Sequence, residues 1–279
     1  MSQKITGRWS GRVVLITGAS AGIGAALAKH MVNEGAKVAL AARRLDRLES
    51  IARRLNELKG ESGSDELALA VSCDVTDLDS VERCVQSVIE RWGRLDVVVA
   101  NAGFGVTGTI ERLTVADYQR QFDTNIFGVI NTLKVALPHL SEQQGRAVII
   151  GSVNGHVALA ANSAYAMSKF AVRALAQSLW VEWQSKQVSV TLIEPGFVDS
   201  EIRKVNNRGV YREHAKDPVP SWMIMPAPKA ARHINRAIYK RKREAVITGH
   251  GKIIVWLARH IPSLIYFALK RVKGRTSTP

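Results

Sequence analysis

Short apolar runs rich in valine, isoleucine and leucine recur along this 279-residue chain and constrain its fold more than any other feature. The runs are apolar on both faces, as expected for central parallel strands that helices cover on both sides. The segments between them have helical spacing, since residues such as Ile23, Leu27 and Met31 fall on one stripe. This alternation predicts a doubly wound α/β fold with a parallel sheet. The runs are residues 13–17, 37–42, 67–73, 96–101, 147–152 and 188–194, and residues 244–248 are a candidate seventh strand after a helix that starts near Pro228.

The net charge of +15 is concentrated at the C-terminal end. Residues 240–279 contain ten of the 39 Lys and Arg residues and one of the 24 acidic residues, so they carry +9 of the total. Basic clusters attract polyanions, and nucleic acid is therefore a partner to consider. Because the excess is confined to one end and no nucleic-acid docking motif accompanies it, we do not expect nucleic acid to bind.

The cysteines, the histidines and the first residues limit other classes of protein. Cys73 and Cys84 have neither metal-ligand nor disulfide-framework spacing, which predicts buried free thiols. The seven histidines are scattered, so no metal site is expected. Residues 1–11 lack the apolar run of a secretory signal, and no uncharged stretch is long enough to cross a bilayer. The sequence therefore predicts a cytoplasmic protein.

The first predicted strand leads directly into a glycine-rich turn, and a helix follows. Glycines allow the tight turn and a close approach to a phosphate, while the helix N-terminus supplies N–H donors. The Gly-x-x-x-Gly-x-Gly spacing differs from the Gly-x-Gly-x-x-Gly fingerprint, and the turn lacks the lysine of a P-loop. A purely structural turn is the alternative, but the position after the first strand favours a cofactor. The candidate contacts are Gly18, Ser20, Ala21, Gly22, Ile23 and Gly24.

The second predicted strand ends in Ala42 and Arg43, where folds that bind NAD place an acidic residue for the ribose 2′-hydroxyl. A carboxylate would repel a 2′-phosphate, whereas a guanidinium can pair with it through two hydrogen bonds. A solvated arginine at the start of a helix is the alternative. The position of Arg43 favours NADP(H) as the cofactor.

Tyr165 and Lys169 lie four residues apart, so on a helix they share one face. An ammonium beside a phenol favours the phenolate and helps proton transfer near neutral pH. The chain contains a second copy of this spacing, Tyr266 and Lys270, which we assign to the surface or the core. Ser152 distinguishes the first copy from the second, because it stands at the C-terminal end of the fifth predicted strand and lies 13 residues before Tyr165. Ligands of open α/β sheets bind at the carboxyl ends of the strands, so Ser152 and Tyr165 are expected to meet there.

Together these features resemble the short-chain dehydrogenase/reductase family, whose fold is a Rossmann-type sheet. The resemblance covers roughly residues 10–250, and we expect a catalytic domain over 1–250 and a basic amphipathic extension over 251–279. The irregular stretch at about 197–227 predicts a lid or a disordered insertion, and we assign it as a lid. Ser200 stands where many members have threonine. The further matching motifs are Asp74-Val75 for the adenine-contacting pair, Asn101-Ala102-Gly103, Asn125 for the helix asparagine, and Pro195-Gly196, with Val198 and Ser200, for the segment that lines the nicotinamide.

The resemblance implies an NADP(H)-dependent oxidoreductase that acts on CH–OH or C=O groups and forms a homo-oligomer. Tyr165 would donate a proton to the carbonyl oxygen, and Ser152 would hydrogen-bond the same oxygen. Lys169 would bind the nicotinamide ribose and lower the pKa of Tyr165, and both residues would contact the cofactor. Asn125 would hold a water that links Lys169 to solvent. A non-catalytic NADP(H)-binding sensor or regulatory protein on the same fold is the alternative.

The residues expected around the substrate are mostly apolar, which favours a hydrophobic carbonyl or alcohol of lipid or steroid type. We expect His156 at the rim of this pocket to satisfy a backbone group rather than to contact the substrate. The expected lining is Phe104, Val153, His156, Val157, Leu159, Phe197 and the lid residues 222–225.

Residues 251–273 form an amphipathic pattern that Pro262 is expected to split into two helices. Trp256, Tyr266 and Phe267 border the polar stripe, as is typical of segments that lie at a membrane surface. Packing on the enzyme's own core or on a second subunit is an equal alternative. The polar stripe is Lys252, Arg259, Ser263 and Lys270, and the opposite side carries Ile253, Ile254, Leu257, Ile261, Leu264, Ile265 and Leu269.

Overall fold

A computed structural model describes residues 7–57, 66–208, 210–212, 214, 217 and 219–271. The described chain folds around one seven-stranded sheet in the order β3-β2-β1-β4-β5-β6-β7, and every neighbouring pair is parallel. All six predicted strands are present, and the candidate seventh strand forms the edge of the sheet. The strands are β1 (Val13–Thr17), β2 (Lys37–Ala42), β3 (Ala68–Ser72), β4 (Val97–Ala100), β5 (Arg146–Ile150), β6 (Ser189–Glu194) and β7 (Glu244–Val246).

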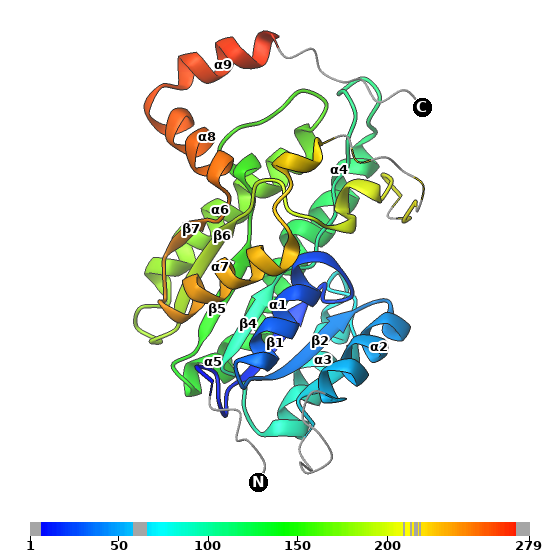
Figure 1. The fold of residues 1–279 in the computed structure, drawn as a ribbon, viewed down its shortest axis with the longest axis vertical. Helices are drawn as coiled ribbons and strands as arrows, with labels where there is room; N and C mark the ends of the chain where they lie inside the picture. The colour runs from blue at the N-terminus through cyan, green and yellow to red at the C-terminus, as the bar shows by residue number, and fades with distance from the viewer. Residues whose placement is uncertain are drawn as a thin grey trace.

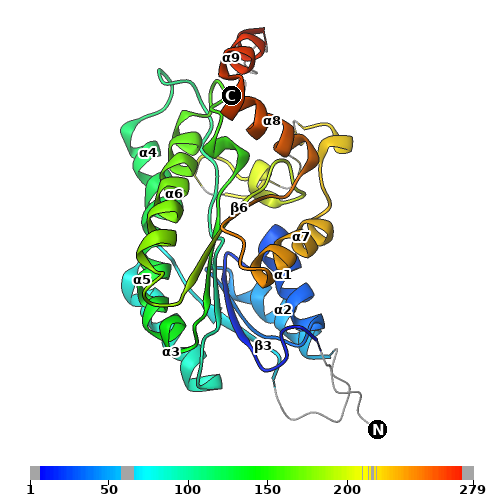
Figure 2. The ribbon, with the colours of Figure 1, turned by 90° about the vertical axis from the view of Figure 1, so that its left-hand side faces the viewer.

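Helices cover both faces of the sheet, as the doubly wound pattern predicts (Figures 1 and 2). Seen edge-on in Figure 2, α3, α5 and α6 lie on one side of the sheet and α1, α2 and α7 on the other. The helices are α1 (Gly22–Asn33), α2 (Leu45–Asn56), α3 (Leu78–Trp92), α4 (Val115–Phe122), α5 (Gly128–Glu142), α6 (Ser163–Glu182), α7 (Ala227–Tyr239), α8 (Gly249–His260) and α9 (Pro262–Arg271), and short helical turns are η2 (Asp123–Phe127, a π-helix), η3 (Val153–Gly155), η4 (Glu201–Lys204) and η5 (Ser221–Met223).

Two apolar cores explain why the strands are buried on both faces. Alternate residues of each strand point to opposite sides, so Val14 and Ile16 of β1 pack with α1 and α7, whereas Val13 and Leu15 pack with α3 and α5. All four of these side chains are buried. A strand with one polar face could not occupy this central position without burying unsatisfied groups.

The order of the strands reverses between β1 and β4, which are neighbours although two strands separate them in sequence. The connections after these two strands run to opposite faces of the sheet, and in open α/β sheets such a switch point leaves a crevice at the carboxyl ends. The glycine-rich turn follows β1, and Asn101-Ala102-Gly103 follows β4. The fold therefore brings these two motifs to the same crevice.

The C-terminal helices α8 and α9 lie beyond the carboxyl ends of the strands, at the top of Figure 1. The chain bends by 115° between them, at the break before Pro262. Two helices were predicted here because a proline interrupts a helix, and the structure contains both. Among the described residues no single helix is long and apolar enough to span a membrane, although the bent pair together meets the length and hydropathy requirements.

Candidate active site

A cleft of about 1310 Å³ opens at the switch point. The structure places Ser152, Tyr165 and Lys169 in its wall, together with all but one of the predicted cofactor contacts. Among the candidate catalytic and cofactor-binding residues, Gly24 and Asn125 are the two outside the lining. The candidate cofactor contacts in the wall are Gly18, Ser20, Ala21, Gly22, Ile23, Arg43, Asp74, Val75, Asn101, Ala102, Gly103, Pro195, Gly196, Val198 and Ser200.

The glycine-rich turn needs its glycines for two different reasons. Gly18 and Gly22 have φ values of +65° and +55°, in the left-handed region that side chains with a Cβ atom disfavour. Gly24 has an ordinary backbone conformation, but a Cβ atom there would lie 2.6 Å from the carbonyl oxygen of Gly18. Gly24 thus allows α1 to pack closely against the turn, and this packing role explains why it does not line the cleft.

Asn101 fixes the glycine-rich turn to the end of β4. Its side-chain amide donates to the carbonyl oxygens of Thr17 and Gly18 at 2.8 and 3.1 Å. The Thr17 hydroxyl oxygen in turn accepts from the backbone N–H groups of Asn101 and Ala102, both at 3.1 Å. These four hydrogen bonds connect the loop after β1 with the loop after β4 and hold them in place at the switch point.

Three arginines surround the far end of this turn. Arg44 donates to the Ser20 hydroxyl at 2.9 Å and forms an ion pair with Glu201 at 2.9 Å. Arg47 contacts the other oxygen of Glu201 at 2.6 Å. Arg43 is exposed, lines the cleft and, within the described part of the chain, has no ion-pair or hydrogen-bond partner. Its guanidinium is therefore available to a ligand.

Ser152 lies two residues beyond β5 and begins the turn η3. Its hydroxyl oxygen accepts from the backbone N–H of Asn154 at 3.1 Å, its hydroxyl donates to the Pro195 carbonyl at 3.5 Å, and its side chain lies close enough to Tyr165 to lower the pKa of the phenol. Tyr165 comes from the first turn of α6, so the contact joins two segments that are 13 residues apart. The predicted meeting of Ser152 and Tyr165 is thus present in the geometry of the cleft.

Lys169 lies one helical turn after Tyr165 on α6. Its ammonium donates to the carbonyl oxygen of Ile150 at 2.9 Å and lies 5.6 Å from the centre of the Tyr165 ring. Burial lowers the pKa of Lys169 to about 8. Burial raises the pKa of Tyr165, while the hydrogen bond with Ser152 and the positive charge of Arg203 act in the opposite direction. The charge of Arg203, which the sequence did not single out, is therefore part of the electrostatics around this phenol.

Asn125 lies behind the cleft wall, in the π-helical turn between α4 and α5. Its side chain binds both backbone groups of Phe104, accepting from the N–H at 3.1 Å and donating to the carbonyl at 3.0 Å. Its amide also lies 3.1 Å from the Ser168 hydroxyl, next to Lys169 on α6. These contacts hold the loop after β4 against α6, and the water that the resemblance assigns to Asn125 stays a prediction.

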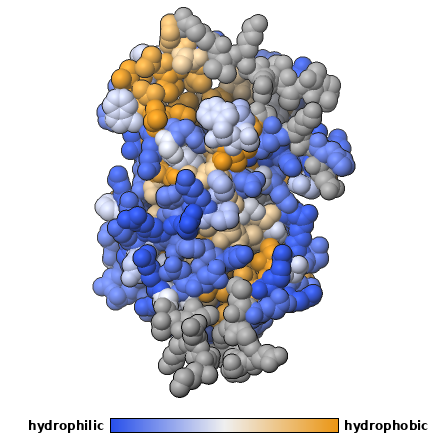
Figure 3. Space-filling model, viewed as in Figure 1, coloured by the Kyte–Doolittle hydropathy of each residue, from blue (hydrophilic) through white to orange (hydrophobic). Residues whose placement is uncertain are grey.

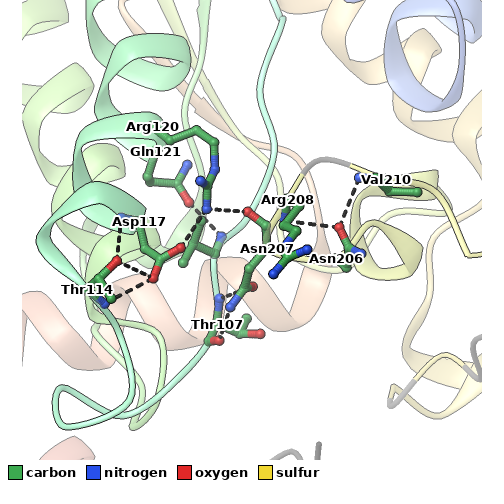
Figure 4. Close-up of polar contacts among 10 residues, drawn as sticks. Thr107, Thr114, Asp117, Arg120, Gln121, Asn206, Asn207, Arg208 and Val210 are labelled. Atoms are coloured by element: carbon green, nitrogen blue, oxygen red, sulfur yellow. Dashed lines mark hydrogen bonds and ion pairs between the residues drawn. The ribbon is translucent and has the colours of Figure 1, made fainter.

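Asn207, in the stretch predicted as a lid, binds the loop after β4 and the helix α4 (Figure 4). The Asn207 side chain accepts from the N–H of Thr107 at 3.0 Å and donates to the carbonyl of Thr107 at 2.8 Å. Arg120 of α4 donates to the Asn207 carbonyl at 2.6 Å while it also binds Asp117. On the opposite side of the cleft, Glu201 binds Arg44 and Arg47. The described lid residues thus make contacts on both sides of the cleft.

Two predictions about the substrate pocket are wrong. His156 does not line the cleft, since its Nε2 lies 2.6 Å from a carboxylate oxygen of Glu194 and its side chain is 2% exposed. Residues 222–225 do not line it either, and the side chain of Trp222 is exposed. Other residues of the lid line the cleft instead, among them Glu201, Arg203 and Asn207. Phe104, Val153, Val157, Leu159 and Phe197 do line it, as predicted.

Several cleft residues escaped the sequence analysis because they belong to no motif. Glu201, Arg203 and Asn207 lie in the irregular lid, and Arg120 lies on an amphipathic helix, where arginine is common. His250 and Ile254 come from α8, most of which, from residue 251 onward, was assigned to the extension, and neither residue was expected in the cleft. The amphipathic pattern of α8 was one signal in the sequence, because the apolar face of such a helix normally packs against another part of the protein.

The fold and the cleft together define an α/β oxidoreductase with a serine, a tyrosine and a lysine grouped at the switch point. Residues 12–210 match the family model described as short chain dehydrogenase. The chain belongs to the short-chain dehydrogenase/reductase family, as the resemblance predicted.

Individual relatives agree over most of their length. A protein from Anopheles gambiae named "Dehydrogenase/reductase SDR family protein 7-like" is 33% identical over 96% of this chain and 86% of its own length. A protein from Sesamum indicum named "11-beta-hydroxysteroid dehydrogenase A" is 30% identical over 94% of this chain and 75% of its own. An alcohol dehydrogenase from Thermococcus sibiricus, solved as a complex with 5-hydroxy-NADP, superposes with a TM-score of 0.71 and is 31% identical, covering 85% of this chain and 94% of its own.

Proposed function

We propose that the protein is an NADP(H)-dependent oxidoreductase that transfers a hydride between the nicotinamide and a carbonyl or secondary alcohol. The observation that carries the proposal is the convergence of Ser152, Tyr165 and Lys169 in the wall of one cleft, beside the glycine-rich turn. A protein that only senses the cofactor has no need of a buried phenol and a buried amine at this place.

The residues present fit a dinucleotide. The cleft runs from the N-terminus of α1, whose backbone N–H groups suit a pyrophosphate, to the Ser152 and Tyr165 side chains. Asp74 and Val75 line it near the glycine-rich turn, where they suit the adenine end, and Pro195 and Gly196 line it beside Ser152. When bound, the nicotinamide would supply or accept the hydride at the Ser152 end.

The protein's own groups would handle the proton. During reduction the Tyr165 hydroxyl gives its proton to the carbonyl oxygen, and the Ser152 hydroxyl donates a hydrogen bond to the same oxygen. The Lys169 ammonium, buried beside the Tyr165 ring, favours the phenolate that remains. The lid residues that bridge the cleft would exclude water while this transfer takes place.

Arg43 is the residue that we propose selects NADP(H) over NAD(H). Arg43→Ala should reduce the preference for NADPH over NADH by about tenfold to a hundredfold, because a hydrogen-bonded charged contact contributes about 1.5–3 kcal/mol. Fluorescence titration with both cofactors measures this preference. Arg53→Ala, an exposed arginine at the other end of α2, is the matched control and should not change it. An unchanged preference in the Arg43 variant would exclude it from cofactor selection.

We propose a hydrophobic substrate of lipid or steroid type, because Phe104, Val157, Leu159 and Phe197 line the substrate end. The name of the Sesamum indicum relative refers to a steroid and agrees with this choice. The test is NADPH oxidation with a panel of ketones and aldehydes that differ in polarity, followed by identification of the alcohol product. A panel in which small polar carbonyls turn over faster than steroid and fatty ketones would contradict the substrate class.

We also propose that residues 251–273, of which 272 and 273 lie outside the described residues, bind an anionic membrane surface. The exposure of Leu264, Tyr266 and Phe267 on α9 favours this proposal over the alternative of packing on the protein's own core, and packing on a second subunit is the other alternative. On α8, Ile253 is 63% and Trp256 53% exposed. Figure 3 shows apolar side chains gathered over these two helices at the top of the molecule. Basic residues accompany them, and apolar side chains beside positive charge suit an anionic lipid surface.

The protein should therefore co-sediment with vesicles that contain phosphatidylserine, and less with pure phosphatidylcholine vesicles. The double variant Ile253→Ser, Trp256→Ser should lose most of this binding, since it removes two exposed apolar side chains and leaves the buried face of α8 intact. Trp222→Ser removes a more exposed tryptophan from another part of the surface and should bind as the wild type does. Equal sedimentation of all three proteins would contradict the membrane proposal.

The homo-oligomer stays a prediction, which light scattering of the purified protein would check. One candidate surface is formed by exposed apolar side chains on α6 and the turn η2. These are Phe127, Met167, Phe170 and Val181.

A further inference from the structure

His250 is the second residue of α8 and lies outside residues 12–210, which match the family model. Its imidazole stacks on the Phe197 ring, with centroids 5.4 Å apart and an angle of 27° between the planes. Both side chains line the cleft. A residue of the C-terminal helices is therefore in direct contact with the segment that follows Pro195 and Gly196.

The contact also includes a hydrogen bond to the backbone. The N–H of Phe197 donates to Nε2 of His250 at 3.1 Å, so Nε2 must be the unprotonated nitrogen of a neutral ring. Burial lowers the pKa of His250, which favours this neutral form. The imidazole thus acts as the acceptor for a backbone group in the wall of the cleft.

Gly196 leaves the space that this contact requires. A Cβ atom on Gly196 would lie 2.3 Å from Nε2 of His250 and 2.5 Å from the hydroxyl oxygen of Thr248. Both of these atoms come from the start of α8. The close approach between α8 and the backbone at residue 196 is therefore possible only with glycine at this position.

The segment of residues 195–197, which His250 contacts, connects Ser152 with the lid. The Pro195 carbonyl accepts from the N–H of Val153 at 2.9 Å and from the Ser152 hydroxyl at 3.5 Å. The Phe197 carbonyl accepts from the N–H of Met225 at 2.9 Å. Between these two anchors, the N–H of Phe197 is held by His250. A shift of this segment would change both the hydrogen bonding around Ser152 and the wall of the cleft next to it.

We propose that His250 is a positioning residue that fixes the segment 195–197 against the nicotinamide end of the cofactor, so that α8 forms part of the active site. The inference rests on the proposed function, because a hydride can reach a carbonyl held by Ser152 and Tyr165 only from a nicotinamide beside this segment. His250 acts through Phe197 and Gly196 and does not contact the reacting atoms.

The test compares two ligands that differ in the nicotinamide. NADPH and 2′-phospho-ADP-ribose share the adenosine, the 2′-phosphate and the pyrophosphate, and the second lacks the nicotinamide. His250→Phe keeps a stacking ring but removes the acceptor, and His250→Gln restores an acceptor without the ring. His260→Phe is the matched control, since His260 also stacks on a ring of α8, that of Trp256, and its Nδ1 lies 2.8 Å from a backbone carbonyl, but it is exposed and outside the cleft.

His250→Phe should bind NADPH on the order of fivefold more weakly, the loss expected for one buried hydrogen bond, with an unchanged dissociation constant for 2′-phospho-ADP-ribose. His250→Gln should recover at least half of this loss on a logarithmic scale, and His260→Phe should bind both ligands as the wild type does. Thermal unfolding midpoints, measured without ligand, should agree among the four proteins within about 2 °C.

Equal weakening for both ligands, a glutamine variant as impaired as the phenylalanine variant, or unchanged NADPH binding in His250→Phe would each overturn the inference and leave the proposed function standing. A wild-type protein that binds neither NADPH nor NADH would overturn the proposed function, and the inference with it. The two failures are therefore distinguishable in the same titrations.

Discussion

Tyr165→Phe should reduce carbonyl turnover by about a thousandfold, within the range that a general acid contributes, while the affinity for NADPH changes by less than about twofold. The variant loses the hydroxyl that donates the proton and keeps the ring, whose edge lies 3.6 Å from the position that a Cβ atom on Gly105 would occupy. Because the ring still fills its place in the wall, the shape of the cleft should be preserved.

The second Tyr-x-x-x-Lys copy provides a control within the same chain. Tyr266 lies on α9 and is exposed, so Tyr266→Phe should retain wild-type turnover of a water-soluble carbonyl. The measurements are steady-state NADPH oxidation and fluorescence titration of NADPH. Equal turnover by Tyr165→Phe and the wild type would remove Tyr165 from the mechanism, whereas a large loss of NADPH binding would indicate a distorted cleft instead of a missing proton donor.

Lys169→Met should nearly abolish turnover, weaken NADPH binding by about tenfold or more, and at the same time stabilise the protein without ligand at pH 7. The lysine side chain is 7% exposed, and its folded pKa of about 8 lies below the value of 10.5 for a free lysine. The buried ammonium therefore costs about 3 kcal/mol at neutral pH. Methionine has a similar volume and no charge, but it leaves the Ile150 carbonyl without its donor, so the expected net gain is about 1–2 kcal/mol.

The stabilisation by Lys169→Met should depend on pH, and the direction of the Lys169 pKa shift gives the sign of this dependence. Between about pH 8 and 10.5 the unfolded wild type binds a proton at Lys169 that the folded protein does not. The contribution of Lys169 to the free energy of unfolding therefore rises with pH across this window, whereas Lys169→Met has no such rise. Urea unfolding at several pH values measures the difference between the two proteins. The advantage of Lys169→Met should shrink above about pH 8 and reverse by about pH 10, because the wild type regains about 3 kcal/mol across this window. A constant difference from pH 7 to 10 would contradict the assigned pKa.

The sheet was predictable because each central strand is apolar on both faces, and no other common element has this pattern over so few residues. β1 and β2 match their predicted runs residue for residue, whereas the order of the strands in the sheet is known from the structure alone. Ser152, Tyr165 and Lys169 were predictable for a related reason. The carboxyl ends of parallel strands meet at one edge, so the serine after β5 distinguished the Tyr-x-x-x-Lys pair that lies in the cleft from its copy at Tyr266.

The contacts of the lid and of α8 were less predictable, because they depend on tertiary packing that produces no periodic pattern in the sequence. Residues 222–225 were expected over the cleft on the basis of their apolar character, but Glu201, Arg203 and Asn207 cover it through polar contacts. His250 and Phe197 are 53 residues apart, and neither belongs to a spacing that marks a pair. His156 was expected to meet a backbone group, whereas its partner is the buried carboxylate of Glu194.

The shared wall between α8 and the cleft has a consequence for protein engineering. A chimaera that exchanges the chain after residue 248 with that of another family member would replace His250 and Ile254, and with them part of the lining of the substrate end. Such an exchange would alter catalysis even if every recognised motif were kept. Conversely, transplanting these helices as a targeting tag would also require Gly196 in the recipient, because a larger residue there would collide with the start of α8.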